Sequence, residues 1–353
     1  MRIISNIILR KIQERNSKEQ KIKKRIFFIN KLRLRSFAQC NVQPKNKSWH
    51  KFSFPDNIYC LYITTSSDNK YMFALTTCGI FKSENLGFTW NVCLKNNGVT
   101  WYVICSDITG QYIIASAKIN VIGDAFYRKS VVFHSENYGQ TWELSSYYSQ
   151  INDNDYLISM KCSDRQSFVL LSMNGYIYES TDYGKNWVTL SIINSWCSSI
   201  ACSYTNKLLI VASKYSKGCI YVSKDYGINW IKQLDISCNL ITASNCCKYL
   251  ACTSNSNLNG GIYVSNDYGT TWIRTLSLSC NWTSITMDYT GKSVYASSSD
   301  DGIYFSDNYG VSWVKLETVF DNWNCFTVNE DGSRLVASTL NYSKKISDIY
   351  VYA

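Results

Sequence analysis

One pattern recurs six times in this chain, and it constrains the fold more than any other feature. The copies begin at serine and end at tryptophan: SENLGFTW from Ser83, SENYGQTW from Ser135, STDYGKNW from Ser180, SKDYGINW from Ser223, SNDYGTTW from Ser265 and SDNYGVSW from Ser306. Their starts lie 52, 45, 43, 42 and 41 residues apart. Self-similarity at a period of about 40 residues is typical of propellers and solenoids.

The chemistry of a tight hairpin explains the residue types in this pattern. Asp or Asn accepts hydrogen bonds from turn amides, Gly takes the positive φ that a turn needs, and Trp buries a large surface between neighbouring sheets. We expect these residues to be structural, because a motif repeated around a ring serves the ring. They are Asn85, Gly87, Trp90, Asn137, Gly139, Trp142, Asp182, Gly184, Trp187, Asp225, Gly227, Trp230, Asp267, Gly269, Trp272, Asn308, Gly310 and Trp313.

Short strands surround each motif. GIYVS precedes the fifth copy and WIRTL follows it, and two more strands, LITASN and YLACTSN, lie upstream. Each repeat therefore has four strands, which is the expected size of a propeller blade.

The two ends of the chain supply a seventh blade. Residues 324–328, 334–338 and 348–352 repeat the first three strands, and residues 48–52 resemble a fourth strand. The sequence therefore predicts an all-β, seven-bladed β-propeller of four-stranded antiparallel blades, in which an N-terminal strand completes the C-terminal blade. Such closure hides two sheet edges. Six or eight blades are the alternatives.

Over residues 42–353 the repeated pattern resembles the Asp-box, or BNR, repeat. That repeat occurs in sialidase-like propellers, sortilin-type receptors and photosystem II assembly-factor propellers. The resemblance to assembly factors, in blade size, implies a non-catalytic protein.

Sialidases resemble one another in an arginine triad, a Tyr–Glu pair and an Asp acid/base. The predicted ring holds four arginines, Arg128, Arg165, Arg274 and Arg334, and only Arg128, through its loop, could face the axis. We therefore expect no enzymatic activity and no catalytic residues. The two histidines, His50 and His134, are expected to be ordinary surface residues.

The basic charge is concentrated at the N-terminus. Residues 1–39 hold 12 of the 36 Lys and Arg but only two of the 26 Asp and Glu, so the remainder has 24 of each. We expect two parts, a basic segment over residues 1–39 and a propeller over residues 40–353, and no nucleic-acid binding by the propeller. The segment has three interpretations: a disordered or partly helical tail, a helix that touches an acidic surface or membrane, or a targeting peptide.

Fifteen cysteines, an odd number in a long chain, favour a reduced intracellular protein, with the cytoplasm as the expected compartment. Cys60, Cys105, Cys162, Cys202, Cys252 and Cys325 fall in predicted strands and are expected to act as small apolar residues. No CxxC pair occurs, so we expect no metal and no cofactor.

Four tryptophans recur at the starts of predicted innermost strands: Trp101, Trp196, Trp282 and Trp323. They are the candidate partner-binding residues, a ring at the channel mouth, with packing as the alternative interpretation. Arg128 and Lys129 adjoin an extra loop on the same face, at 118–129, and residues 341–348 form another. Loops grouped on one face are a hint of recognition.

The sequence thus predicts a monomeric, non-catalytic scaffold that binds a protein partner through one face. Two alternatives remain: a glycan-binding or sialidase-like glycoside hydrolase, and a structural component of a larger assembly.

Overall fold

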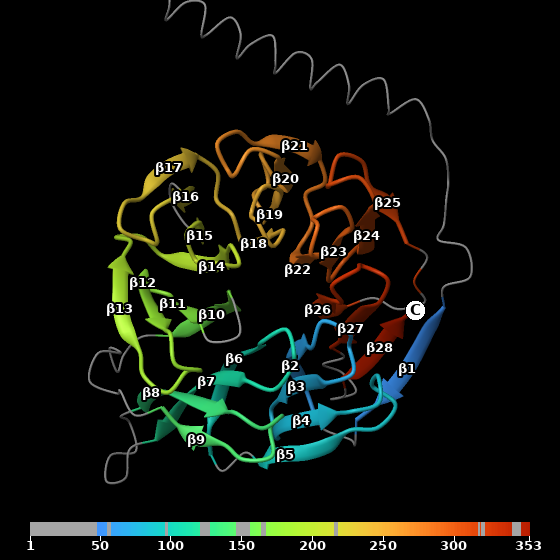
Figure 1. Cartoon of the computed structure of the whole chain (residues 1–353). Helices are drawn as coiled ribbons and strands as arrows, with labels where there is room; N and C mark the ends of the chain where they lie inside the picture. Colours follow the sequence, from blue (N-terminus) through green and yellow to red (C-terminus); the bar gives the residue numbers. More distant parts are fainter. Residues whose placement is uncertain are drawn as a thin grey trace, which may run out of the picture. The chain divides into compact units, whose positions relative to one another are not determined.

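Seven four-stranded antiparallel sheets are arranged in a ring in the computed structural model (Figure 1). The structure describes residues 48–54, 58–95, 98–120, 128–145, 156–163, 167–214, 218–316, 318, 322–340 and 347–353. The predicted N-terminal segment, residues 1–39, lies outside these ranges. Within them no helix occurs, and hence none long and apolar enough to cross a membrane. The all-β, seven-bladed propeller predicted from the repeats is confirmed.

Each blade contributes one strand to each of four positions, from the axis outward. The innermost strands are β2 (Cys60–Thr65), β6 (Thr100–Ser106), β10 (Leu157–Cys162), β14 (Cys197–Cys202), β18 (Leu240–Ala243), β22 (Trp282–Met287) and β26 (Trp323–Val328). The second strands are β3 (Met72–Thr76), β7 (Ile113–Asn120), β11 (Phe168–Ser172), β15 (Leu209–Ser213), β19 (Leu250–Ser254), β23 (Val294–Ser298) and β27 (Leu335–Thr339).

The two outer positions complete the sheets. The third strands are β4 (Gly79–Ser83), β8 (Arg128–Ser135), β12 (Tyr176–Ser180), β16 (Ile220–Ser223), β20 (Gly261–Ser265), β24 (Gly302–Ser306) and β28 (Asp348–Tyr352). The outermost are β5 (Asn91–Lys95), β9 (Glu143–Leu144), β13 (Val188–Ile192), β17 (Ile231–Leu234), β21 (Ile273–Leu276), β25 (Val314–Lys315) and β1 (Trp49–Ser53). We number the blades from one (β2–β5) to six (β22–β25), and blade seven consists of β26–β28 and β1.

Blade seven draws its strands from both ends of the chain. Strand β1 pairs antiparallel with β28, so that Trp49 lies opposite Tyr352 and Ser53 opposite Asp348. The indole of Trp49 lies 5.1 Å from that of Trp323 and 4.8 Å from the ring of Tyr352, measured between ring centroids. The outermost strand of this blade is therefore anchored by aromatic packing as well as by its ladder.

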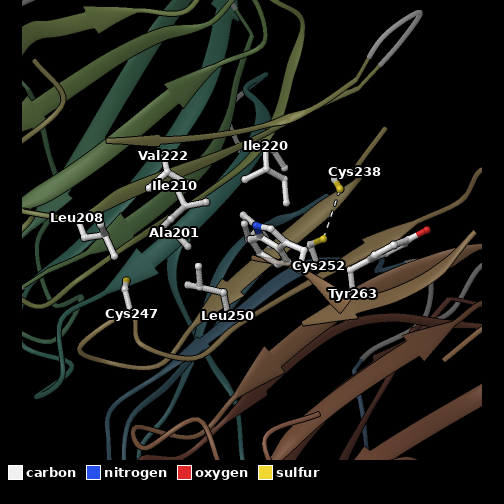
Figure 2. Close-up of a cluster of buried hydrophobic side chains, with 13 residues drawn as sticks. Ala201, Leu208, Ile210, Ile220, Val222, Cys238, Cys247, Leu250, Cys252 and Tyr263 are labelled. Carbon is white, nitrogen blue, oxygen red and sulfur yellow. Dashed lines mark hydrogen bonds between the residues drawn. The ribbon is translucent and has the colours of Figure 1, made fainter. Parts of the chain in front are cut away.

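The hydrophobic core lies between adjacent sheets. Six of the second strands are buried along their whole length, as expected for apolar strands covered on both faces. Figure 2 shows the cluster between blades four and five, in which Ile210 and Val222 of one sheet meet Leu250 and Cys252 of the next.

The cysteines within the described residues are free thiols. As predicted, Cys60, Cys105, Cys252 and Cys325 are buried and fill apolar space, while Cys162 and Cys202 are half-buried. Burial raises the pKa of the Cys105 thiol to about 11. The Cys105 thiol therefore remains protonated and unreactive near neutral pH.

Candidate functional site

The repeated hairpins are held together internally. In blade three, Ser180 Oγ donates to Asp182 Oδ1 at 2.9 Å and accepts from the Gly184 amide at 2.9 Å, and Trp187 Nε1 donates to the Gly184 carbonyl oxygen at 3.0 Å. Partial burial would raise the pKa of Asp182, but hydrogen bonds from Asn186 and Ser180 outweigh it and lower the pKa. The carboxylate is thus engaged within its own hairpin.

The hairpins and the turns between first and second strands share one face, which we call the turn face. The amides of Tyr138, Tyr226, Tyr268 and Tyr309, one in each of four hairpins, donate to carbonyl oxygens of Gln111, Lys207, Lys248 and Lys292 in the turns of the same blades.

A chain of backbone hydrogen bonds links the turn tips from blade to blade. Each donor amide and its acceptor carbonyl lie in adjacent blades, 2.8–3.0 Å apart: Tyr204 to Asn245, Asn245 to Tyr289, Tyr289 to Glu330, Glu330 to Ser67, and Ser67 to Ile108. Among the described residues, these bonds join the turns of six blades; residues 164–166, in the turn of blade three, lie outside the described part. The turn tips form a rigid rim, because each is fixed by its neighbours and not by its own turn alone.

A cavity of about 260 Å³ lies inside this rim, and all seven blades line it. Its wall is formed by the ends of the innermost strands, including Cys105, Cys162, Cys202 and Met287. Lys161 lies exposed at the cavity, as does Glu330. This is the end of the central channel that opens on the turn face.

Three of the rim tips expose large apolar side chains. Ile108, Tyr204 and Tyr289 are between 42% and 48% exposed, although turn tips ordinarily carry polar residues. Exposed apolar groups on a rigid frame, next to a concave site, are typical of an interaction surface.

Two further cavities flank the central one and share lining residues with it. Asn245 lines both the central cavity and one of about 440 Å³ between blades four and five. Tyr289 and Glu330 line both the central cavity and one of about 650 Å³ that blades six, seven and one surround. The three cavities are therefore neighbours on the turn face.

The flanking cavities differ in charge. The cavity between blades four and five contains Lys207 and Lys224 and no acid, and no ion pair of either lysine occurs among the described residues. The cavity across blades six, seven and one contains Asp68, Glu330 and Asp331, with Arg334 as its base. The turn face is thus basic on one side of the mouth and acidic on the other.

The buried carboxylates of the central cavity accept hydrogen bonds from residues of their own turns. Asp107 accepts hydrogen bonds from Thr109 Oγ1 at 2.6 Å and from the Tyr112 amide at 3.1 Å. Asp288 accepts from the amides of Lys292 at 3.0 Å and Ser293 at 2.8 Å. A glycosidase needs two carboxyl groups that flank the scissile bond. Of the described acids in the central cavity, Glu330 alone is exposed.

The predicted ring of tryptophans requires a correction. Trp101, Trp282 and Trp323 are buried between sheets, where they pack against Phe133, Tyr304 and Tyr350 respectively. They cannot present a stacking surface to a partner. Trp196 is 55% exposed and is the one candidate of the four that a partner can reach.

The register position of each residue explains this difference. Trp101, Trp282 and Trp323 lie at the same register position, opposite Ala117, Ser298 and Thr339 of the second strands. In blade four that position is held by Cys197, which lies opposite Ser213 and is also buried. Trp196 comes one residue earlier, before β14 begins, and does not occupy this buried position.

Most residues of the basic candidates and of the extra loops lie outside the described part of the chain. Lys129 is half-buried on β8, where it lies opposite Ile119 of β7. The side chain of Arg128 is outside the described part, as are residues 121–127 and 341–346 of the two loops and Arg165. Arg274 donates to the carbonyl oxygen of Gly260. The sequence predicted that His134 is a surface residue, but this side chain is buried on β8.

The turn face was missed as a candidate surface. A signal was present, because DITG from Asp107, SYTN from Ser203 and DYTG from Asp288 place an apolar residue at the same point of three turns. Among the described residues, no group of three or more His, Cys, Asp and Glu is arranged to hold a metal.

Comparisons with known proteins agree with the fold. Residues 220–234 match the family model described as BNR-Asp box repeat. A solved structure of YCF48 bound to D1 peptide is similar, with a TM-score of 0.60 and 14% identity over 86% of this chain and 96% of that one. YCF48 from Cyanidioschyzon merolae gives a TM-score of 0.63 with 11% identity, over 86% and 98% of the two chains.

An enzyme has a similar fold as well. The GH74 xyloglucanase from Xanthomonas campestris gives a TM-score of 0.62 with 14% identity, over 83% of this chain but 52% of that one. No curated protein matches the sequence. The likeness therefore extends to a peptide-bound propeller and to a glycosidase, and it concerns the fold alone.

Proposed function

We propose that this chain, a seven-bladed β-propeller of BNR Asp-box repeats, is a non-catalytic scaffold that binds a protein partner on its turn face. The observation that carries the proposal is the rim: Ile108, Tyr204 and Tyr289 are exposed on turns that a chain of backbone hydrogen bonds holds in place. Rigid apolar and aromatic side chains lose little conformational entropy on binding, so they are effective anchors for a partner.

The hollow beside the rim suits a polypeptide. It consists of three neighbouring cavities, and the two outer ones differ in charge, which would fix the direction in which an extended segment lies. The similar fold of YCF48, of which a structure bound to D1 peptide is known, supports a peptide ligand by analogy.

The alternative is a glycan-binding or glycan-cleaving protein, favoured by the likeness to a xyloglucanase. Tyrosine rings also stack on sugars. Hydrolysis is disfavoured because Asp107 and Asp288 are bonded within their turns, which leaves Glu330 without a partner carboxylate among the exposed acids of the central cavity.

Affinity purification from source cells with quantitative mass spectrometry tests the proposal. The baits are the full chain, an Ile108→Ser/Tyr289→Ser variant of the rim, and a Trp196→Ser variant. Trp196 is the exposed one of the four predicted tryptophans and does not belong to the rim. We expect the proteins enriched by the full chain to fall about tenfold with the rim variant and to persist with Trp196→Ser. Loss with Trp196→Ser alone would assign binding to that residue's surface. Hydrolysis of xyloglucan or a sialoside by the full chain would refute the non-catalytic part.

A further inference from the structure

A ladder of tyrosine pairs crosses the turn face from blade to blade. The tyrosine before the hairpin glycine stacks on a tyrosine that precedes the second strand of the neighbouring blade. Centroid distances are 4.5 Å for Tyr71–Tyr138, 4.0 Å for Tyr112–Tyr183 and 4.1 Å for Tyr249–Tyr309. The ladder fills the groove between blades one and two, two and three, and five and six.

The ladder is interrupted at two described interfaces, between blades three and four, where Ser167 precedes the second strand, and between blades four and five. The hairpin tyrosine there is Tyr268, but the residue that precedes the second strand of blade four is Leu208. Leu208 is buried and belongs to the cluster between these two blades, where it lies beside Cys247 at one end (Figure 2). The aliphatic side chain reaches the core, and among the described residues no aromatic ring stacks on Tyr268, which is 45% exposed.

A cavity occupies the position of the missing ring. It has a volume of about 440 Å³ and is lined by Tyr204, Leu208, Cys246 and Tyr268, with Lys207 and Lys224. Lys224 Nζ donates to Thr270 Oγ1 at 3.3 Å, and Lys207 lies exposed. Two cations without a lining acid favour negative charge in a ligand, and two tyrosine rings favour an aromatic group.

We infer that this cavity is the specificity pocket of the turn face, and that it takes an aromatic side chain of a partner polypeptide flanked by acidic residues. The aromatic ring stacks on Tyr268 and replaces the tyrosine that the ladder lacks. The flanking carboxylates lie against Lys207 and Lys224. The inference rests on the proposed function, since it names the partner chemistry that this face selects.

The test uses fluorescein-labelled peptides and fluorescence anisotropy with the full chain. The probes are Glu-Glu-Phe-Glu-Glu, the same peptide with Ala for Phe, and Lys-Lys-Phe-Lys-Lys. We expect Glu-Glu-Phe-Glu-Glu to bind and each of the other two to bind at least about tenfold more weakly. The alanine peptide lacks the aromatic anchor, and the lysine peptide lacks charge complementarity to Lys207 and Lys224. Equal binding of the lysine and glutamate peptides, or no binding of the glutamate peptide up to millimolar concentration, would overturn the inference.

The decisive variant is Leu208→Tyr, which gives blade four the tyrosine that precedes the second strand in blades one, two and five. It should fold and close the pocket, so that binding of Glu-Glu-Phe-Glu-Glu falls at least about tenfold. Tyr268→Ser, which removes an exposed ring, should act in the same direction. Lys207→Glu/Lys224→Glu should also weaken binding, while Lys70→Glu, at an exposed lysine in the corresponding turn of blade one, should change it by less than about twofold.

These outcomes separate the pocket from the proposed function. If Leu208→Tyr binds the peptide as the full chain does, the pocket is wrong. If Leu208→Tyr keeps all of the cellular partners while Ile108→Ser/Tyr289→Ser loses them, the rim binds the partner and the pocket plays no part. If Leu208→Tyr loses the peptide while Ile108→Ser/Tyr289→Ser keeps the cellular partners, specificity lies in the pocket and the proposed role of the rim is wrong.

Discussion

The backbone amide of Glu330 donates a hydrogen bond of 3.0 Å to the carbonyl oxygen of Ser67, and this bond joins the last blade to the first. On the same interface, Asn324 Nδ2 donates to the carbonyl oxygen of Cys60 at 2.8 Å. The junction where the two ends of the chain meet is therefore bonded in the same manner as the interfaces between consecutive blades. Stability of the ring should depend on the strands that form this junction.

Removal of the aromatic anchor of β1 tests that dependence. Trp49→Ala deletes the indole that packs on Trp323 and Tyr352, and we expect a loss of about 2 to 3 kcal/mol in the free energy of unfolding. Urea denaturation followed by tryptophan fluorescence measures it. His50→Ala, at an exposed position of the same strand, is the control and should shift the midpoint little. Equal effects of the two would show that β1 contributes little to the ring.

Two tryptophans of blades three and four separate structural from surface roles. Trp187 is fully buried and donates to the Gly184 carbonyl oxygen, so Trp187→Ala should cost about 3 to 5 kcal/mol. Trp196→Ala should cost less than about 0.5 kcal/mol, because most of that side chain is in water. Thermal denaturation of both variants makes the comparison. A large loss with Trp196→Ala would contradict its assignment as a surface residue.

His134 should make stability depend on pH in a defined window. Burial lowers its pKa, against the opposing effect of Glu136 and Glu143, while nearby Lys185 acts in the same direction as burial. The unfolded chain has a histidine pKa of about 6.5, so above roughly pH 7 both states are neutral and the group contributes no pH dependence. As the pH falls below that value, the unfolded state binds the proton first, and stability decreases.

The measurement is the urea midpoint between pH 7.5 and pH 5, with His134→Gln as the comparison. We expect the slope of stability against pH in this window to flatten in the variant. Carboxylates whose pKa is lowered by hydrogen bonds, such as Asp182 and Asp301, titrate below this window and do not obscure it. An unchanged slope would mean that His134 titrates alike in both states.

Thiol reactivity should follow burial. Burial raises the pKa of Cys105 to about 11, and burial together with nearby Cys219 raises that of Cys197 to about 12. At pH 8 a thiol of pKa 11 is ionised in roughly one molecule in a thousand, and the buried sulfur is also shielded. Brief alkylation of the native protein with iodoacetamide, read by mass spectrometry, should label exposed Cys78 and Cys246 first. Labelling of Cys105 at the same rate would contradict the burial.

The sequence predicted the fold because six of the seven blades carry the same octapeptide pattern. The octapeptide fixes the hairpin between third and fourth strands, and the spacing of its copies fixes the blade length. Trp49 could be recognised because it lies one repeat before Trp90.

The site was harder to predict, because it depends on which register position a residue occupies. Trp196 and Trp282 look equivalent in the sequence, but they differ by one register position, which places one in water and the other in the core. The gap at Leu208 is also invisible without the Tyr71–Tyr138 pair as a reference, since stacking joins residues of different blades. Exposed turn residues such as Tyr289 could have been predicted from their position in the turn sequence.

Site-specific photo-crosslinking tests the central claim most directly. The photoreactive amino acid p-benzoylphenylalanine replaces Tyr289 on the turn face in one full-length protein and Trp196 in another, and both are irradiated in source cells. The account predicts that position 289 forms a discrete covalent adduct with a protein, that the adduct is lost when Ile108→Ser is added, and that position 196 gives none. An adduct at position 196 with none at position 289 would contradict the assignment of the partner to the turn face.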